Sequence, residues 1–358
     1  MARKFDTLAV HAGAEPDRET GAVAPPLHFS TTFVHAPPGE TDDFSYQRVD
    51  NPTQRRLETA LAALEGGERA LAYASGMGAV AAVLDTLQPG QRVVVPEDCY
   101  VGTRGYVTEV LPERGVEVVT VDTTDLDAVR AACKPGVALL WAESPSNPRL
   151  RISDLVELAK IAHAGGGRFA CDNTFATPVL QRPLELGADI VMHSTTKYFG
   201  GHSDVLGGAL IFAKNDDFAE RIAARRLLTG AILAPFSAWL TLRAIARLRV
   251  WLTATTDSTI RKGTPKSCAV LSSATASFGK HEPPNPGPAL RKRAPMRSSR
   301  PIPRATSSTS APTSSQRSAI SLMNVILVAR NALAAYLMSS AVRRCVKTKR
   351  DGSILSGA

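Results

Sequence analysis

The chain has 358 residues, of which 44% are hydrophobic, and this is enough for one large domain and a smaller one. Its five cysteines are scattered without a CxxC pair, which excludes a disulfide framework and a cysteine-based zinc site. The N-terminus has no apolar stretch of signal-peptide length, so we expect a cytoplasmic protein.

The net charge of +9 conceals two compositions joined end to end. Residues 1–240 carry 22 Lys and Arg against 30 Asp and Glu, as in an acidic soluble enzyme, whereas residues 241–358 carry 20 against 3. Residues 281–317 contain eight prolines and almost no large apolar side chains. Because such a segment cannot bury enough surface to offset the entropy of ordering, we expect residues 251–358 to form a basic Ser/Pro/Arg-rich tail. This tail should be mostly disordered, with at most one helix at 321–339.

Residues 1–50 predict an extended N-terminal arm, because five prolines interrupt any long helix and no strand alternation persists. Residues 51–250 predict a separate α/β domain. Its first helix is expected over 54–64, opened by Pro52 and closed by Gly66 and Gly67.

From residue 70 onward the pattern alternates between strands and helices. The expected elements are strand 70–74, turn 75–78, helix 79–87, strand 92–95, helix 102–111, strand 116–121, helix 125–132, strand 137–142, a helix with Ser153 as its N-cap that ends at 165–167, strand 168–171 and strand 190–193. This alternation predicts a mostly parallel sheet wrapped by helices, with ligands beyond the carboxyl ends of the strands.

Candidate chemical groups follow several of these strands directly. The turn Ser75-Gly-Met-Gly78 opens a helix, where unpaired backbone N–H groups suit a phosphate. Tyr100, Asp172 and Lys197 each come shortly after another strand. A lone Ser-x-x-Lys is more often a surface lysine after a strand, and a lone strand-end carboxylate is usually a cap. Together, a phosphate cradle, a flat ring, a carboxylate and a reactive lysine are what pyridoxal phosphate requires.

Seven segments then carry a resemblance to a known family. They are Tyr46-x-Arg48, Asn51-Pro-Thr53, Ser75-Gly-Met77, Tyr100-x-Gly-Thr103, Glu143-Ser-Pro-x-Asn-Pro148, Asp172-Asn-Thr174 and Ser194-x-Thr-Lys197. In order and spacing they resemble the cysteine/methionine-metabolism family of pyridoxal-phosphate enzymes, which includes cystathionine γ-synthase, cystathionine γ-lyase, cystathionine β-lyase and methionine γ-lyase. The resemblance implies a fold type I, aspartate-aminotransferase-like domain with pyridoxal 5'-phosphate as its cofactor.

The resemblance also implies a role for each matching residue. Lys197 would hold the cofactor covalently through its amine and then move protons on the substrate. Asp172 would pair with the ring N–H and keep the ring an electron sink, and Tyr100 would stack on the ring and take part in catalysis. Gly76 and Met77 would give backbone N–H groups to the phosphate.

Further residues are implied at the rim of the same site. Ser194 and Thr196 would add hydroxyls to the phosphate, although such hydroxyls equally well cap the local backbone. Asn147 would lie near the cofactor hydroxyl or the substrate carboxylate, and Thr174 near the ring. Glu143 is expected to be structural.

Tyr46 and Arg48 resemble a pair that reaches the phosphate of the neighbouring subunit. Arginine suits this role because its planar fork binds phosphate oxygens through two charge-assisted hydrogen bonds. The resemblance therefore implies a homo-oligomer, a dimer of dimers, with each site shared between subunits.

The implied reaction is γ-elimination or γ-replacement on a small sulfur-containing or O-acylated amino acid. In a γ-synthase a thiol such as cysteine adds back, whereas in a γ-lyase the product is a 2-oxo acid with ammonia. The sequence leaves open which of these, or a β-lyase reaction, takes place.

The resemblance stops near residue 250. Residues 234–246 still look like the family helix that leads toward a small C-terminal domain, but the Ser-Leu-Gly segment and the substrate-binding arginine of that domain are missing. The abrupt gain of Arg, Ser and Pro is typical of a shifted reading frame or a fused tail. Because the arginine that would orient the substrate is missing, we expect much reduced or absent turnover.

A second hypothesis is an inactive cofactor-binding remnant whose basic tail binds nucleic acid or another acidic partner. Nucleic acid is disfavoured, because no aromatic residues of the kind that stack on bases interleave the charges. A membrane anchor over 319–342 is disfavoured as well, since Asn324, Arg330 and Asn331 interrupt it.

Overall fold

The structure, a computed structural model, describes residues 4–37, 40, 43–134 and 136–249. The predicted tail over 251–358, its helix at 321–339 and the segment 319–342 lie outside the described residues. The described residues include almost all of the predicted arm and of the predicted α/β domain.

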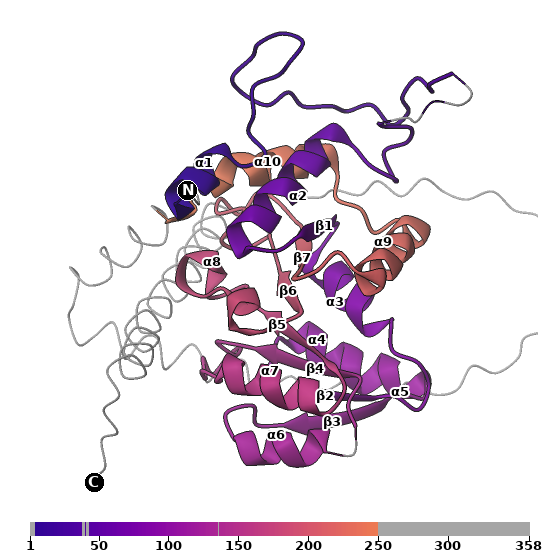
Figure 1. Ribbon diagram of the computed structural model, residues 1–358, viewed down its shortest axis with the longest axis vertical. Helices are drawn as coiled ribbons and strands as arrows, with labels where there is room; N and C mark the ends of the chain where they lie inside the picture. The colour runs from indigo at the N-terminus through magenta and orange to yellow at the C-terminus, as the bar shows by residue number, and fades with distance from the viewer. Residues whose placement is uncertain (1–3, 38–39, 41–42, 135, 250–358) are drawn as a thin grey trace, which may run out of the picture. The chain divides into compact units, whose positions relative to one another are not determined.

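A single open sheet forms the centre of the described part of the chain (Figure 1). Its strands are β1 (Arg69–Tyr73), β2 (Arg92–Pro96), β3 (Glu117–Val121), β4 (Leu139–Glu143), β5 (Arg168–Asp172), β6 (Ile190–His193) and β7 (Gly208–Phe212). They lie in the order β1-β7-β6-β5-β4-β2-β3, and only β7 runs antiparallel to its neighbours, β1 and β6. The predicted mostly parallel sheet is confirmed, and β7 is an addition to it.

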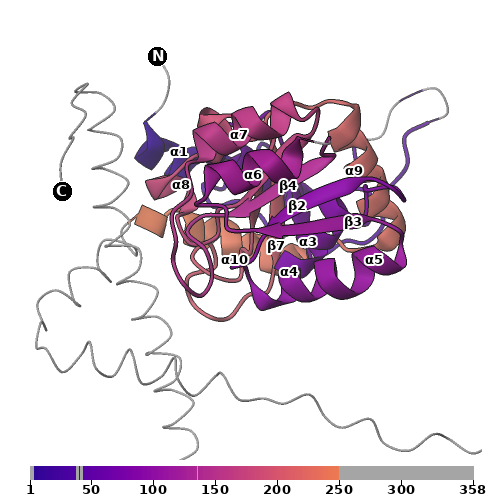
Figure 2. The ribbon, with the colours of Figure 1, turned by 90° about the horizontal axis from the view of Figure 1, so that it is seen from below.

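Helices cover both faces of the sheet, as Figure 2 shows for α6 and α7 on one face and α4 and α5 on the other. The helical segments are α1 (Phe5–His11), α2 (Pro52–Glu65), α3 (Gly76–Leu84), α4 (Val101–Gly105), a π-helical turn (Tyr106–Val110), α5 (Leu111–Glu113), α6 (Leu126–Cys133), α7 (Leu155–Ala164), α8 (Thr177–Leu180), a 3₁₀ turn (Pro183–Leu186), α9 (Asp217–Thr229) and α10 (Pro235–Ile245). The last of these is the helix expected at 234–246.

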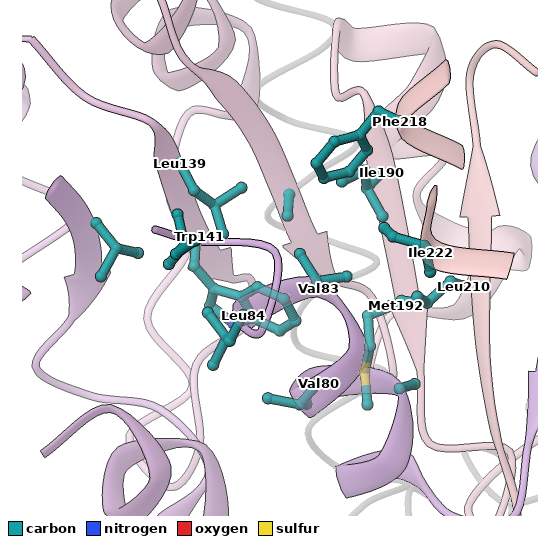
Figure 3. Close-up of a cluster of buried hydrophobic side chains, with 14 of the residues drawn as sticks. Val80, Val83, Leu84, Leu139, Trp141, Ile190, Met192, Leu210, Phe218 and Ile222 are labelled. Atoms are coloured by element: carbon teal, nitrogen blue, oxygen red, sulfur yellow. The ribbon is translucent and has the colours of Figure 1, made fainter. Parts of the chain in front are cut away.

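Alternating apolar side chains produce these layers, because successive strand residues point to opposite faces. On β4, Leu139 and Trp141 belong to the cluster that includes α3 and α9. Leu140 and Ala142 belong to the cluster that includes α6 and α7. Figure 3 shows α3 side chains lying between Trp141 and Met192. Since both faces are filled, polar chemistry is confined to the ends of the strands.

The N-terminal arm is not extended throughout, which corrects one expectation. Residues Phe5–His11 form α1, and Ala9 and Ala12 are buried in the cluster that α2 and α10 share. The prolines begin only at Pro16, so nothing in the first 15 residues interrupts a short helix. Packing against α2 supplies the stabilisation that a seven-residue helix lacks by itself.

Two helix starts also differ from the expectation. Helix α3 begins at Gly76, so the predicted turn 75–78 is its first turn, with Ser75 as N-cap. Helix α7 is capped by Asp154, whose carboxylate accepts from the Glu157 amide, and not by Ser153. The hydroxyl of Ser153 instead lies 2.8 Å from that of Thr123, so a tertiary contact takes it away from the helix end.

Three of the cysteines lie in the described residues, and all three are buried free thiols. Burial raises the pKa of the Cys99 thiol to about 12 and that of Cys133 to about 11. Across the described ranges, no group of three or more His, Cys, Asp and Glu side chains could hold a metal ion. Nor does any helix there have the length and apolarity to cross a membrane.

Candidate active site at the carboxyl ends of the strands

The turn after β1 presents the N-terminus of α3. The Ser75 hydroxyl accepts from the Gly78 amide at 3.0 Å, while the amides of Gly76 and Met77 take part in no hydrogen bond within the described residues. Gly76 lies so close to β6 that a Cβ there would be 2.9 Å from the Cβ of Ser194. Two free N–H groups at the positive end of a helix therefore lie beside Ser194, as an anion site requires.

A hydrogen-bonded chain joins the ends of β5 and β6. Asp172 ends β5 and is 7% exposed, and its Oδ1 accepts from the Thr174 amide at 2.9 Å. The Thr174 hydroxyl in turn accepts from the Ser194 amide at 2.8 Å. The predicted carboxylate and the start of the lysine turn are thus fixed relative to each other.

Lys197 lies on a tight turn that follows β6. Its amide donates to the Ser194 carbonyl at 3.1 Å, and its own carbonyl accepts from the Gly201 amide at 2.8 Å. The residue is exposed, and its amine makes no hydrogen bond or ion pair with any other described residue. A lysine with a fixed backbone and an unpaired amine is suited to react with a carbonyl compound.

Tyr100 is brought to the same edge by Glu143. Glu143, the last residue of β4, accepts a hydrogen bond from the Tyr100 amide at 2.7 Å. The Tyr100 ring and the Met77 sulfur both crowd Gly102, where an added Cβ would lie 2.7 Å and 2.9 Å from them. Tyr100 is 41% exposed, so one face of a ring adjoining the start of α3 remains available for stacking.

The two buried carboxyls at this edge differ in how strongly their surroundings favour the charged form. Glu143 and Asp172 are directly paired across β4 and β5. Burial, reinforced by the neighbouring charge of Asp172, raises the pKa of Glu143 well above its usual value. Burial also raises the pKa of Asp172, but hydrogen bonds from Thr174 and the charge of His193 act in the opposite direction. Of the two carboxyls, Asp172 is therefore the one whose surroundings favour the charged form.

Two predicted residues have surroundings of another kind. The Thr196 hydroxyl donates to the Gly207 carbonyl and accepts from the Gly207 amide, both at 3.1 Å, so its hydrogen bonds go to the local backbone. Asn147 is half-buried in the loop after β4, and its side chain forms no hydrogen bond within the described residues.

The structure places Arg48 against α9, with the Tyr46 ring beside it. The Arg48 guanidinium donates to the Leu227 carbonyl at 2.8 Å and lies 5.3 Å from the centre of the Tyr46 ring. Within this chain Arg48 therefore contacts α9 and the Tyr46 ring rather than the turn of Lys197. A role at the site of a neighbouring subunit stays a prediction.

A buried polar network beneath the strand ends was not predicted. His193 Nε2 lies 2.6 Å from Glu65 Oε1, which also accepts from the Asn173 side chain at 2.9 Å. Gln181 donates to the Asn173 side chain and to the Ser144 carbonyl. The sequence contained one signal, because His193 and Asn173 directly adjoin predicted site residues. However, no local sequence pattern identifies Glu65 as their partner.

These groups fit pyridoxal phosphate. The free amides at the start of α3 suit its phosphate, the buried anion Asp172 suits a protonated ring nitrogen, and the unpaired amine of Lys197 suits its aldehyde. Within the described residues the Asp172 carboxylate accepts hydrogen bonds only from Thr174, so a further N–H donor would find an acceptor there.

Comparison with known proteins gives the same assignment. The family described as "Cys/Met metabolism PLP-dependent enzyme" matches residues 6–262. A protein described as "Probable cystathionine gamma-synthase" from Herpetosiphon aurantiacus is 42% identical over 246 residues, which are 69% of this chain and 77% of that protein. "Cystathionine beta-lyase" from Coxiella burnetii is 44% identical over 247 residues, 69% of this chain.

Solved structures agree with this match. Cystathionine gamma synthase from Xanthomonas oryzae pv. oryzae, in complex with aminoacrylate and cysteine, superposes with a TM-score of 0.70 at 37% identity, over 73% of this chain and 68% of that one. The match spans just under two thirds of several relatives, for example 64% of the Coxiella burnetii protein. The fold is that of fold type I pyridoxal-phosphate enzymes, and the chain belongs to the Cys/Met metabolism PLP-dependent enzyme family.

Proposed function

We propose that this protein is a pyridoxal-phosphate-dependent transsulfuration enzyme that acts on sulfur-containing or O-acylated amino acids by γ-elimination or γ-replacement. One observation carries the proposal. The anion Asp172, the turn of Lys197 and the free amides of α3 meet at one edge of the sheet, joined through Thr174 and Ser194. The names of relatives, which include cystathionine gamma-synthase, cystathionine gamma-lyase and cystathionine beta-lyase, support the substrate class.

When bound, the cofactor supplies a ring that withdraws electrons and so acidifies the C–H bonds of an attached amino acid. Asp172 would offer its carboxylate to the ring nitrogen, and hydrogen bonds from Thr174 favour the charged form of that carboxylate. The Lys197 amine would hold the cofactor and, once released from it, would accept the proton from the α-carbon of the substrate. Two backbone hydrogen bonds fix the turn of Lys197, which limits the region that the amine can reach.

Tyr100 and α3 set the orientation of the ring. The bond from its amide to Glu143 fixes Tyr100 at the mouth of the site, where its exposed ring can stack on the cofactor. The amides of Gly76 and Met77, which form no other hydrogen bond within the described residues, would hold the phosphate. The Ser194 hydroxyl, beside Gly76, adds a further donor.

The test begins with the folded wild-type protein reconstituted with pyridoxal phosphate. We expect an absorbance band of covalently held cofactor, and borohydride reduction with peptide mass spectrometry should place the cofactor on Lys197. Lys197→Ala should abolish both signals. Lys214→Ala is the matched control, because Lys214 follows the antiparallel strand β7 at the opposite edge of the sheet. A folded wild-type protein without the band would disprove the proposal.

Products then identify the reaction. Incubation with O-acylated homoserine and cysteine should yield cystathionine if the protein is a γ-synthase. Incubation with cystathionine should yield a 2-oxo acid and ammonia if it is a γ-lyase. A holoenzyme that releases pyruvate from cystathionine with no 2-oxobutyrate would contradict reaction at the γ-carbon.

A further inference from the structure

The loop after β2 carries Tyr100, but the backbone pairing between β2 and β4 stops well before this residue. The ladder between the two strands ends at Val94 and Leu140. In contrast, β4 and β5 remain paired as far as Glu143 and Asp172. The position of Tyr100 relative to Asp172 therefore depends on contacts other than the ladder between β2 and β4.

Two buried hydrogen bonds join the loop after β2 to the end of β4 and the loop that follows it. The Tyr100 amide donates to Glu143 Oε2 at 2.7 Å. Ser146 Oγ lies 2.5 Å from Oδ2 of Asp98, which is two residues before Tyr100. The second bond was not predicted from the sequence, and it holds the approach to Tyr100 against the loop after β4.

The direction of the second bond follows from the other partner of the Ser146 hydroxyl. The Arg151 amide donates to Ser146 Oγ at 3.0 Å, so the single proton of the hydroxyl is free to point at Asp98. Ser146 is 3% exposed and Asp98 is 6% exposed. Because a buried acceptor that loses its donor pays the full cost of desolvation, removal of this hydroxyl should be felt strongly.

The backbone of Ser146 is also fixed. Its amide donates to the Arg151 carbonyl at 3.0 Å, and its carbonyl accepts from the Leu150 amide at 2.9 Å. Ser146 is therefore a rigid point in the loop after β4, against which the loop after β2 can be held.

Other contacts between the two loops lie nearer the surface. Arg149 and Arg151 approach Glu97 Oε1 at 3.7 Å and 3.3 Å, and all three side chains are at least a third exposed. Exposed ion pairs contribute little, because water screens their charges. The buried bond between Asp98 and Ser146 is therefore stronger than these surface contacts.

We propose that Asp98 and Ser146 are positioning residues, whose hydrogen bond fixes the loop after β2 against the loop after β4 and so holds the Tyr100 ring where it stacks on the cofactor. The inference rests on the proposed function, in which Tyr100 orients the cofactor ring. Neither residue of the pair touches the cofactor in this proposal; both act through Tyr100.

The experiment compares Ser146→Ala with the matched control Ser153→Ala. Ser153 lies in the same loop, is 6% exposed, and has its hydroxyl 2.8 Å from that of Thr123 in the loop after β3. The control therefore loses a buried hydroxyl contact of the same kind without loosening the loop after β2. Thermal unfolding is measured for both variants.

For Ser146→Ala we expect about tenfold weaker cofactor binding by absorbance titration. The circular dichroism of the bound cofactor band should also change, because that signal depends on how the ring is oriented among its neighbours. Ser153→Ala should match the wild type in both measurements. Asp98→Asn keeps an oxygen that can accept from Ser146, so its affinity should stay within about threefold of the wild type. Wild-type affinity and dichroism in Ser146→Ala would overturn the inference.

A double-mutant cycle with Tyr100→Ala separates positioning of Tyr100 from a general loosening of the site. In the Tyr100→Ala background, Ser146→Ala should weaken cofactor binding by less than about twofold, because the residue through which it acts is gone. A second tenfold loss in that background would show that Ser146 acts independently of Tyr100, and the inference would be wrong.

Hydrogen–deuterium exchange tests the pair without cofactor. Peptides that cover residues 97–104 should exchange faster in Ser146→Ala than in the wild type or Ser153→Ala. Equal exchange in all three proteins overturns the inference. A wild-type protein that takes up no cofactor, in a series that does show this difference, refutes the proposed function and leaves the positioning of Tyr100 by Asp98 and Ser146 standing.

Discussion

At the scale of single residues, the site depends on two adjacent carboxyls with unequal charge. Glu143 and Asp172 are paired across β4 and β5, and both are buried. The charge of Asp172 opposes ionisation of Glu143 and, together with burial, raises the pKa of Glu143 well above its usual value. Asp172 receives the hydrogen bonds of Thr174 and the influence of His193, whereas Glu143 has only the Tyr100 amide to favour its charged form.

Different consequences are therefore expected from neutralising each carboxyl. Glu143→Gln removes no charge and keeps an oxygen for the Tyr100 amide, so cofactor affinity should stay within about twofold. Asp172→Asn removes the anion opposite the ring nitrogen and should weaken binding by roughly 1.5–3 kcal/mol. Absorbance titration with pyridoxal phosphate measures both. Equal losses in the two variants would show that the charges are assigned wrongly.

At the scale of elements, the site is built where α3 approaches the end of β6. A Cβ on Gly76 would lie 2.9 Å from Ser194 Cβ, closer than side chains normally approach. A Cβ on Gly78 would meet nothing nearer than 3.5 Å, from the Ser75 hydroxyl. Because Gly76 has no side chain, the first turn of α3 can pack directly against the end of β6.

This pair of glycines provides a matched test. Gly76→Ala should push the first turn of α3 away from Ser194, with a loss of cofactor affinity of about tenfold or more. Gly78→Ala should bind the cofactor as the wild type does. Its free energy of unfolding should be equal to that of the wild type or higher by up to about 1 kcal/mol, because alanine has a higher helix propensity than glycine. Tight cofactor binding by Gly76→Ala would refute the close approach.

At the scale of the whole molecule, the arm raises the question of assembly. Tyr46 is 43% exposed, and Arg48 contacts α9 and Tyr46 within this chain. The shared site implied by the family resemblance requires the same two residues to serve a neighbouring subunit.

Complementation tests the shared site. Arg48→Ala should weaken cofactor binding by roughly 1.5–3 kcal/mol if one set of charged hydrogen bonds is lost. A mixed oligomer of Arg48→Ala and Lys197→Ala chains should contain some sites in which both residues are intact, and these should bind cofactor covalently. If the mixture gains no such sites over either variant alone, the site is not shared.

The C-terminal tail is the other prediction at this scale. From its composition we expect residues 253–316 to be cleaved rapidly by protease, and turnover of cystathionine or O-acylated homoserine to be much reduced even when the cofactor binds. Limited proteolysis with mass spectrometry, followed by the assay, measures both. A resistant fragment that extends past residue 300, with ordinary turnover, would contradict the prediction.

The sequence by itself determined the parts of this protein that local pattern encodes. Short apolar runs that alternate with helices predicted most strands, and polar residues just beyond them predicted Asp172, Lys197 and the start of α3, because the ends of parallel strands meet at one edge. Helix α1 and strand β7 were missed. The first is short and stabilised by packing on α2, and the second is a buried run placed between β1 and β6 by long-range pairing.

Only the tertiary structure decided which residues pair across long separations and what charge they carry. Glu65 and His193 are 128 residues apart, so no periodicity or motif joins them. The pKa values of Glu143 and Asp172 depend on burial and on neighbours from other strands, which are properties of the folded chain. Local sequence patterns identify the reactive residues, and the packing of the sheet determines the pKa values of their side chains.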